Sequence, residues 1–222
     1  MTRRMVIGID VGGTFTDVVG LDNDGKPLMF KVPSNPSDPA AAVIEGINSV
    51  AKGLNTSTEE ILSEVDIVHG TTMGINTLLT RSGAKTALLT THGFRDILEM
   101  RTGYKNERYE LDLAPPEPLI PRSMRKTIRE RVNGDGTIIQ PLDEEDVVSR
   151  CRELVAFDVE AVAICFLWSF LNPTHETRTA EICKEIIPDA FVTTSWDVLP
   201  ELREYNRVST TALNAYIGPK VI

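Results

Sequence analysis

Residues 8–17 read GIDVGGTFTD, a run that places a carboxylate, two adjacent glycines and two threonine hydroxyls within one short turn. Residues 5–9 are predicted to form a buried strand that ends at Asp10. Residues 15–21, rich in Thr and Val, are predicted to form a second strand that returns from the turn. The two glycines therefore fall in a hairpin.

A turn of this composition is suited to binding phosphate. Gly12 and Gly13 lack a Cβ, so they can adopt positive φ and let backbone N–H groups approach an anionic oxygen. Thr14 and Thr16 add hydroxyl donors beside them. Asp10, at the strand end, can hold a hydrated Mg²⁺ against the same phosphates. The alternative is an ordinary glycine-rich hairpin, which seldom needs this combination of residues.

Two better-known phosphate loops do not fit the sequence. It contains no G-x-x-x-x-G-K-[ST], and its glycine spacing is not G-x-G-x-x-G. Both of those motifs lead into a helix, whereas this turn leads into a strand. Actin-like ATPases and sugar kinases use the strand–turn–strand form. A sugar kinase is also expected to show a catalytic Asp in a sugar-binding context, and no clear one is found.

Composition and charge limit the classes of partner. A chain of 222 residues with 41% hydrophobic residues can bury one large core or two small ones. The net charge of −9 argues against nucleic acid or an anionic membrane, because both attract a basic surface. The longest apolar stretch, residues 161–168, is far shorter than the ~20 residues that cross a bilayer. The apolar run after Thr2-Arg3-Arg4 is too short for a signal peptide. We expect a cytoplasmic protein.

The cysteines indicate a reducing compartment. Cys151, Cys165 and Cys183 are widely spaced, and each lies in an apolar periodic pattern. The sequence has no C-x-x-C or Cys/His cluster that would bind zinc. We expect three buried thiols rather than disulfides or a catalytic cysteine.

Beyond the hairpin, strands and helices alternate as in an α/β protein. One helix is predicted to begin at Pro39, with Asp38 as its N-cap, and another short helix to begin after Ser57. The predicted buried stripe of the first helix is Ile44, Ile47, Ala51 and Leu54. Further strands are predicted at residues 27–32, 66–70, 85–90, 127–131, 137–140, 161–166 and 191–195, and further helices at residues 73–81, 143–156, 174–187 and 201–216. The proline-rich residues 101–123 are predicted to cross between subdomains.

A second polar cluster, His-Gly-Thr-Thr at residues 69–72, lies at the carboxyl end of the strand predicted at residues 66–70, which is expected to be buried. Ligands in α/β sheets gather at such strand ends. Gly70 permits close backbone approach, and Thr71 or Thr72 can cap the next helix, whose N-terminus favours an anion. His69 can titrate near neutrality, and Asn76 lies one helical turn further on. The alternative is an N-cap beside a hydrogen-bonded core histidine.

These residues recur in a known order: the chain resembles the N-terminal part of the hydantoinase A/5-oxoprolinase family, which also includes acetone-carboxylase subunits. The resemblance runs nearly end to end. It rests on GIDVGGTFTD at 8–17, HGTT at 69–72 with NTLL at 76–79, TTHGFRD at 90–96, PLIPR at 118–122, NPTHE at 172–176, and EYNR at 204–207 with Thr210, Asn214, Ala215 and Tyr216. Residues 73–75, Met-Gly-Ile, differ from the Val-Ala-Thr usual there, which leaves the substrate open.

The resemblance implies an actin-like (ribonuclease H-like) first ATPase lobe with an additional α/β subdomain. Its first phosphate loop is matched by Asp10, Gly12, Gly13, Thr14 and Thr16, with ATP and Mg²⁺ as cofactors. The substrate or the transferred phosphoryl group is expected to meet His69, Thr71, Thr72 and Asn76. His92 and Arg95 also match the family, and we expect structural roles for them. Glu204 and Arg207, at i and i+3, are either a solvated ion pair or part of a helix that leads into a second lobe.

The activity implied by the resemblance is ATP-dependent hydrolysis of a cyclic amide, in which ATP phosphorylates the carbonyl oxygen of a lactam or imide. A companion subunit of the hydantoinase B type is the implied partner. The alternatives are a carboxylase subunit that activates a ketone or bicarbonate, and a non-enzymatic domain that serves assembly. Residues 1–196 would form the family's N-terminal domain and residues 197–222 the start of its ATPase core. Family members continue well beyond this length, so the segment by itself is expected to be inactive.

Overall fold

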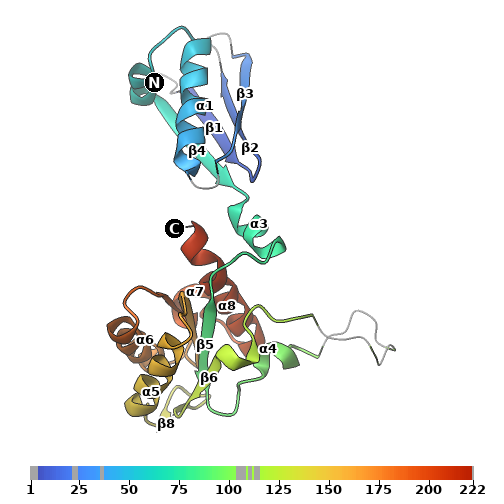
Figure 1. Ribbon diagram of the computed structural model, residues 1–222. Helices are drawn as coiled ribbons and strands as arrows, with labels where there is room; N and C mark the ends of the chain where they lie inside the picture. Colours follow the sequence, from blue (N-terminus) through green and yellow to red (C-terminus); the bar gives the residue numbers. More distant parts are fainter. Residues whose placement is uncertain are drawn as a thin grey trace. The chain divides into compact units, whose positions relative to one another are not determined.

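The computed structural model describes residues 5–21, 25–35, 38–103, 109, 112 and 116–221. The chain divides into two compact units, Met1–Ser82 and Gly83–Ile222, each with its own core (Figure 1). Residues 2–4, Thr-Arg-Arg, and part of the predicted crossing segment lie outside the described residues. Residue 101 and residue 123 both belong to the second unit, so the predicted crossing at 101–123 is wrong: the chain passes between units at Ser82–Gly83.

The first unit is a four-stranded sheet with helices, and its central hairpin is the predicted one. The strand order is β3-β2-β1-β4, with β4 parallel to β1 and the other pairs antiparallel. The strands are β1 (Met5–Val11), β2 (Phe15–Leu21), β3 (Pro27–Pro33) and β4 (Val65–Thr71). The helices are α1 (Pro39–Gly53), α2 (Thr58–Glu64) and α3 (Met73–Leu79). β4 is an edge strand with Val68 61% exposed, so the predicted burial of this strand is wrong.

Helix α1 covers one face of this sheet. The core beneath it contains Ile7, Ile9 and Val18, and a Cβ on Gly46 of α1 would lie 2.4 Å from Val18 Cγ2. Because side chains alternate along a strand, residues 7, 9 and 11 face the helix, whereas residues 6, 8 and 10 face away from it. Asp10 is exposed, in agreement with this alternation.

Helix α1 begins as predicted, but one residue of its predicted stripe is exposed. Asp38 accepts a hydrogen bond from Ala41 N at 3.2 Å, and Pro39 occupies the first turn. Ile47 is buried, whereas Ile44 is 56% exposed. The helix packs with its close approach at Gly46 toward the sheet, which leaves Ile44 at the edge of the buried face.

The second unit is built on a four-stranded parallel sheet with the order β10-β9-β5-β6. Its strands are β5 (Thr86–Thr91), β6 (Arg125–Ile128), β9 (Ala161–Cys165) and β10 (Phe191–Thr194). Its helices are α4 (Ile97–Met100), η1 (Arg122–Met124), α5 (Glu144–Val155), α6 (Thr174–Ile186), α7 (Ser195–Val198) and α8 (Glu204–Val221). Every residue of β5 and β9 is buried, as expected for a parallel sheet covered by helices. The predicted α/β architecture is confirmed.

The strand predicted at residues 127–131 is divided between two sheets. β6 pairs with β5, whereas β7 (Arg131–Val132) pairs with β8 (Ile138–Gln140) in a separate hairpin. The side chain of Glu130, between the two strands, is buried and points to other partners described below. The segment predicted as one strand therefore contains parts of two strands, one paired with β5 and one paired with β8.

The second unit begins at Gly83, which packs closely against helix α8. A Cβ on Gly83 would lie 2.2 Å from Cε1 of Tyr216, so only glycine fits against this ring. Ala84 N donates a hydrogen bond to Tyr216 O at 2.9 Å. Among the described helices, none is long and apolar enough to cross a membrane.

Candidate functional site

The glycine turn between β1 and β2 is tight. Gly12 N donates to Phe15 O at 3.0 Å, and Thr14 O accepts from Ser34 N at 2.9 Å. Neither Gly12 nor Gly13 has positive φ, so the expected reason for glycine at these positions is wrong. Gly12 has to be glycine because there is no room for a side chain: a Cβ at this position would lie 2.8 Å from Phe15 O.

A cavity of about 150 Å³ lies beside this turn, wholly within the first unit. Its lining is Val11, Gly12, Gly13, Ser34, Asn35, Met73, Asn76, Thr77, Thr80 and Ser82. Most of the side chains that line it carry a hydroxyl or an amide. A Cβ on Gly13 would lie 3.2 Å from Asn76 Nδ2, so a side chain at position 13 would crowd the amide that faces the turn. The cavity combines bare backbone and neutral donors, as an anion site requires.

The second polar cluster is brought to the first through α3. Asn76 Nδ2 donates to Thr72 Oγ1 at 3.2 Å, and Thr72 N donates to Val11 O at 3.3 Å. Thr72 is the N-cap residue of α3, but the first-turn N–H of Met73 is bound by Thr71 Oγ1 at 3.1 Å. The strand end, the helix start and the glycine turn therefore form one connected structure.

Thr14 and Thr16 have different environments. Thr14 is exposed at the turn. Thr16 is fully buried, and its hydroxyl lies 3.0 Å from Ser34 Oγ. Thr16 therefore holds Ser34, a cavity residue, in place from beneath.

Asp10 and His69 lie on opposite faces of the sheet. Asp10 pairs in register with Asp17 and with Gly70, whereas the exposed His69 pairs with Ile9. Since neighbouring strand residues face opposite ways, Asp10 and His69 are not brought together. The carboxylate of Asp10 is instead on the same face as that of Asp17, whose Oδ1 lies 2.7 Å from Lys31 Nζ.

These two carboxylates are the acidic groups closest to the turn by register. Within the described ranges, no group of three or more His, Cys, Asp or Glu is placed to hold a metal ion. Mg²⁺ keeps several waters and takes one or two carboxylates, so Asp10 with Asp17 has the donor chemistry that it needs.

Five polar lining residues were not predicted as site residues: Ser34, Asn35, Thr77, Thr80 and Ser82. Ser34 and Asn35 reach the turn because β3 pairs with β2, with Pro33 opposite Phe15. The available signal was that Ser34 and Asn35, two polar residues, come shortly after the strand predicted at residues 27–32.

The family blocks NPTHE and EYNR form a buried network in the second unit. Glu176 accepts hydrogen bonds from Phe166 N at 2.8 Å, Ser195 Oγ at 2.6 Å and Trp196 N at 3.0 Å. Arg207 is fully buried and donates to Phe166 O at 2.7 Å. The alternative of a solvated Glu204–Arg207 ion pair is therefore wrong. Burial raises the pKa of Glu176, although its hydrogen bonds act in the opposite direction.

His175 extends the same network toward β6. Its Nδ1 lies 2.8 Å from Glu130 Oε2, and Thr91 Oγ1 also donates to Glu130. Thr91, Phe166 and Ser195 each lie at the carboxyl end of a strand of the parallel sheet or directly after it. The network is closed by protein groups, so we interpret it as structural.

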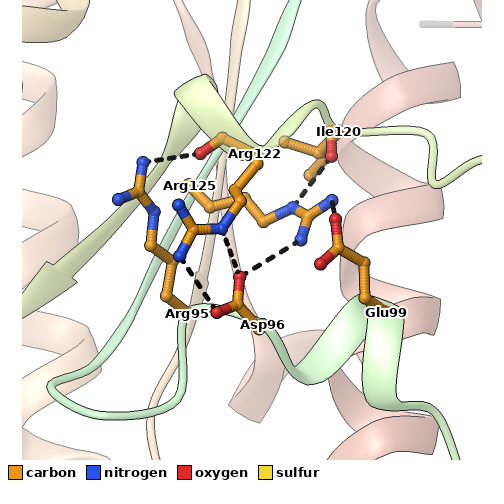
Figure 2. A network of polar contacts seen from close by, with 6 residues as sticks. All are labelled: Arg95, Asp96, Glu99, Ile120, Arg122 and Arg125. Atoms are coloured by element: carbon orange, nitrogen blue, oxygen red, sulfur yellow. Dashed lines mark hydrogen bonds and ion pairs between the residues drawn. The ribbon is translucent and has the colours of Figure 1, made fainter.

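Arg95 lies in a second network, which joins α4 to the segment before β6 (Figure 2). It donates to Arg122 O at 2.8 Å, and Arg122 binds both oxygens of Asp96, at 2.8 and 3.1 Å. The buried Arg125 donates to Ile120 O at 2.9 Å and to Glu99 Oε1 at 3.2 Å. The hydrogen bond from Arg122 lowers the pKa of Asp96. These contacts support the expected structural role of Arg95, while His92 is exposed.

The antiparallel hairpin, the parallel β4 and the cavity at the glycine turn define the first lobe of an actin-like fold, here with an additional α/β unit. A family model of the hydantoinase/oxoprolinase N-terminal region matches residues 6–187. The chain belongs to the hydantoinase/oxoprolinase family.

Named relatives agree with this assignment. The chain is 40% identical over 216 residues to the caprolactamase subunit alpha of Pseudomonas jessenii, covering 96% of this chain and 31% of the relative. It is 30% identical over 250 residues to the 5-oxoprolinase of Saccharomyces cerevisiae, covering 97% and 19%. The chain thus spans about a third or less of the length of these relatives.

Two solved structures have a fold similar to that of this chain. The ATP-dependent caprolactamase from Pseudomonas jessenii matches with a TM-score of 0.84 at 40% identity, over 96% of this chain and 31% of that one. A nucleotide-free acetone carboxylase, described in a study of ATP-dependent acetone carboxylation, matches with a TM-score of 0.87 at 30% identity, over 98% and 33%.

Proposed function

We propose that the cavity beside Gly12 and Gly13 binds the phosphates of ATP, and that this chain supplies the phosphate-binding lobe of an ATP-dependent cyclic amide hydrolase. The observation that carries the proposal is the meeting of Gly13 and Asn76 at a cavity lined by neutral donors. It is supported by 40% identity to a caprolactamase that is described as ATP-dependent.

Each residue has a distinct part in this proposal. Gly12 and Gly13 expose backbone, Thr14 adds a hydroxyl, and Thr16 holds Ser34 in the wall. Asn76 presents its amide to the phosphate chain. Asp10, with Asp17, holds Mg²⁺ through water.

The remaining predicted residues are assigned to the substrate side. Thr71 and Thr72 order the start of α3, and the exposed His69 is free to meet a cyclic amide. Bound ATP would supply the phosphoryl group that makes the amide carbonyl a better electrophile. A five-membered amide ring closes again easily, so coupling its opening to ATP carries the reaction to completion.

An ATP-dependent ketone carboxylase is the second candidate. The observation that favours it is the TM-score of 0.87 to acetone carboxylase. A non-enzymatic assembly domain is the third candidate.

We propose further that the protein works in the cytoplasm with a companion subunit of the hydantoinase B type. The companion subunit is supported by the caprolactamase relative, which is itself a subunit, and the cytoplasm by the three cysteines, which are free and buried. The division into domains at 1–196 and 197–222 also remains a proposal.

Nucleotide binding is the direct test of the site. We expect Asn76→Asp to weaken binding of a fluorescent, non-hydrolysable ATP analogue with Mg²⁺ at least tenfold, because it places a negative charge against the phosphates. Asn55→Asp is the matched control: it makes the same charge change on an exposed residue after the far end of α1, about 22 Å of helix away from Ser34 and Asn35. Equal affinities of the two variants would refute the site.

The reaction needs a separate test. The intact protein with its companion subunit and Mg²⁺-ATP is given either cyclic amides (hydantoins, 5-oxoproline, caprolactam) or ketones with bicarbonate, and phosphate release is measured. Release that depends on the cyclic amide is expected. Release with ketone and bicarbonate would assign the carboxylase reaction instead, and release with neither would favour the assembly domain.

A further inference from the structure

Two cysteines of the second unit are in contact. Cys151 of α5 and Cys183 of α6 are both fully buried, and their sulfur atoms lie 3.2 Å apart. Both thiols are free. The chain has three cysteines, all described, and the third, Cys165, is buried in β9.

This contact is close to the geometry of a covalent bond. A disulfide has a sulfur–sulfur distance of about 2.05 Å, so the two atoms need to approach by about 1 Å. Helices α5 and α6 pack against each other along this contact, and each also borders the parallel sheet. A shift of that size is within the reach of a side-chain rotation with a small adjustment of the helices.

We propose that Cys151 and Cys183 are a site of reversible oxidation, at which a peroxide joins α5 to α6 by a disulfide bond. One thiolate attacks hydrogen peroxide and becomes a sulfenic acid while hydroxide leaves. The second thiol then attacks that sulfur and water leaves. In sum, two thiols and one peroxide give one disulfide and two waters: the cysteines lose two electrons and the peroxide gains them. The proposal is independent of the proposed function.

The hydrogen bond between the two sulfurs favours this order of events. Across this contact either sulfur can donate its S–H to the other. The hydrogen bond lowers the pKa of Cys151, while the same bond and burial raise the pKa of Cys183. Burial raises the pKa of Cys165 to about 12. A thiol that donates its S–H across this contact stabilises its neighbour as the thiolate, so one sulfur of the pair attacks the peroxide and the other is the resolving thiol beside it.

The test treats the native protein with hydrogen peroxide, then unfolds it in urea so that an alkylating reagent blocks every free thiol, and digests it without reductant. An endoprotease that cleaves after glutamate places the cysteines in three separate peptides, residues 146–153, 161–176 and 182–185. Mass spectrometry should find the first and third joined, two hydrogen atoms lighter than their sum, and separated again by a dithiol. Cys165 should remain alkylatable.

Variants sharpen the result. Cys165→Ser should keep the joined peptide, whereas Cys151→Ser and Cys183→Ser should each lose it. The measurement on the unaltered protein does not depend on the folding of any variant. The proposal is overturned if exposed methionines such as Met29 become oxidised while 146–153 and 182–185 stay unjoined, or if Cys165 joins either peptide as often as they join each other.

Discussion

At the scale of single residues, the two turn glycines are required for different reasons. Gly12→Ala would press a Cβ to 2.8 Å from a backbone oxygen, and we expect it to lower the free energy of unfolding by about 1–3 kcal/mol. Gly13→Ala meets only the end of the Asn76 side chain, so it should weaken nucleotide binding with little loss of stability. Urea unfolding and analogue binding measure the two effects.

Gly8→Ala, on the strand β1 that leads into the turn, is the control. Its Cβ would lie 3.9 Å from Val19 O, an ordinary contact, so stability should change by no more than about 0.5 kcal/mol. If Gly12→Ala were as stable as Gly8→Ala, the close packing of Gly12 against Phe15 O would be contradicted.

A second residue-scale prediction concerns pH. Burial raises the pKa of Glu176 in the folded protein, so between its ordinary value and the folded value the folded state binds more protons than the unfolded chain. Glu176 therefore favours folding most below an ordinary pKa of 4.5, and this contribution is lost as pH rises through the folded value. Glu176→Gln cannot titrate and should show a smaller fall in stability with rising pH.

Urea unfolding at a series of pH values from about 4 to 8 measures this difference. Glu185→Gln, on the exposed side of the same helix, is the control and should follow the unaltered protein. Parallel curves for Glu176→Gln and the unaltered protein would contradict the assigned direction. The sequence showed that residues 172–176 belong to a family block. It could not show that Glu176 is buried, because its partners Phe166 and Ser195 follow strands β9 and β10 and lie outside helix α6.

At the scale of elements, α1 offers a matched pair of isoleucines. Ile47→Ala should lower the free energy of unfolding by about 2–5 kcal/mol, because it removes buried methylene groups from the core of the first unit. Ile44→Ala should cost less than about 0.5 kcal/mol, because its side chain is mostly exposed. Chemical denaturation compares them, and equal losses would mean that the helix face is wrongly assigned.

Local patterns predicted most elements well. The hairpin of β1 and β2 could be predicted because its alternation, glycines and return strand are contiguous. Ile44 was misplaced because helical spacing alone gives a stripe about 100° wide or more, and the contact at Gly46 decides where its centre lies. The run at 127–131 was predicted as one strand, although only its first part pairs with β5. Because β5 is distant in sequence, the local pattern could not show that this pairing stops at Ile128.

At the scale of the whole molecule, the two separate cores predict separate responses to a core mutation. In Ile47→Ala, hydrogen exchange should speed up roughly thirtyfold or more at Ile9 and Val18 of the first unit. Exchange at Leu88 and Ala163, in the core of the second unit, should be unchanged. Exchange that speeds up equally in both would show one cooperative core instead.

The assembly of the candidate site was only partly predictable. Gly12, Gly13 and Asn76 were named from sequence, and the structure brings them to one cavity. The separation of Asp10 from His69 was not foreseen, because the pairing of β1 with β4, residue by residue, decides which face each side chain takes. Ser34 and Asn35 were missed for the same reason: their place depends on the register of β3.

The stacking of Gly83 on the Tyr216 ring has a practical consequence for anyone who wishes to divide this chain or insert a reporter into it. If the chain is cut, or a segment is inserted, before Gly83, the Cα of Gly83 keeps its contact with the Tyr216 ring. A cut or an insertion placed a residue later would separate Gly83 from Ala84, whose amide is tied to the same tyrosine. The bond between Ser82 and Gly83 is therefore the last place at which the chain can be divided with this contact intact.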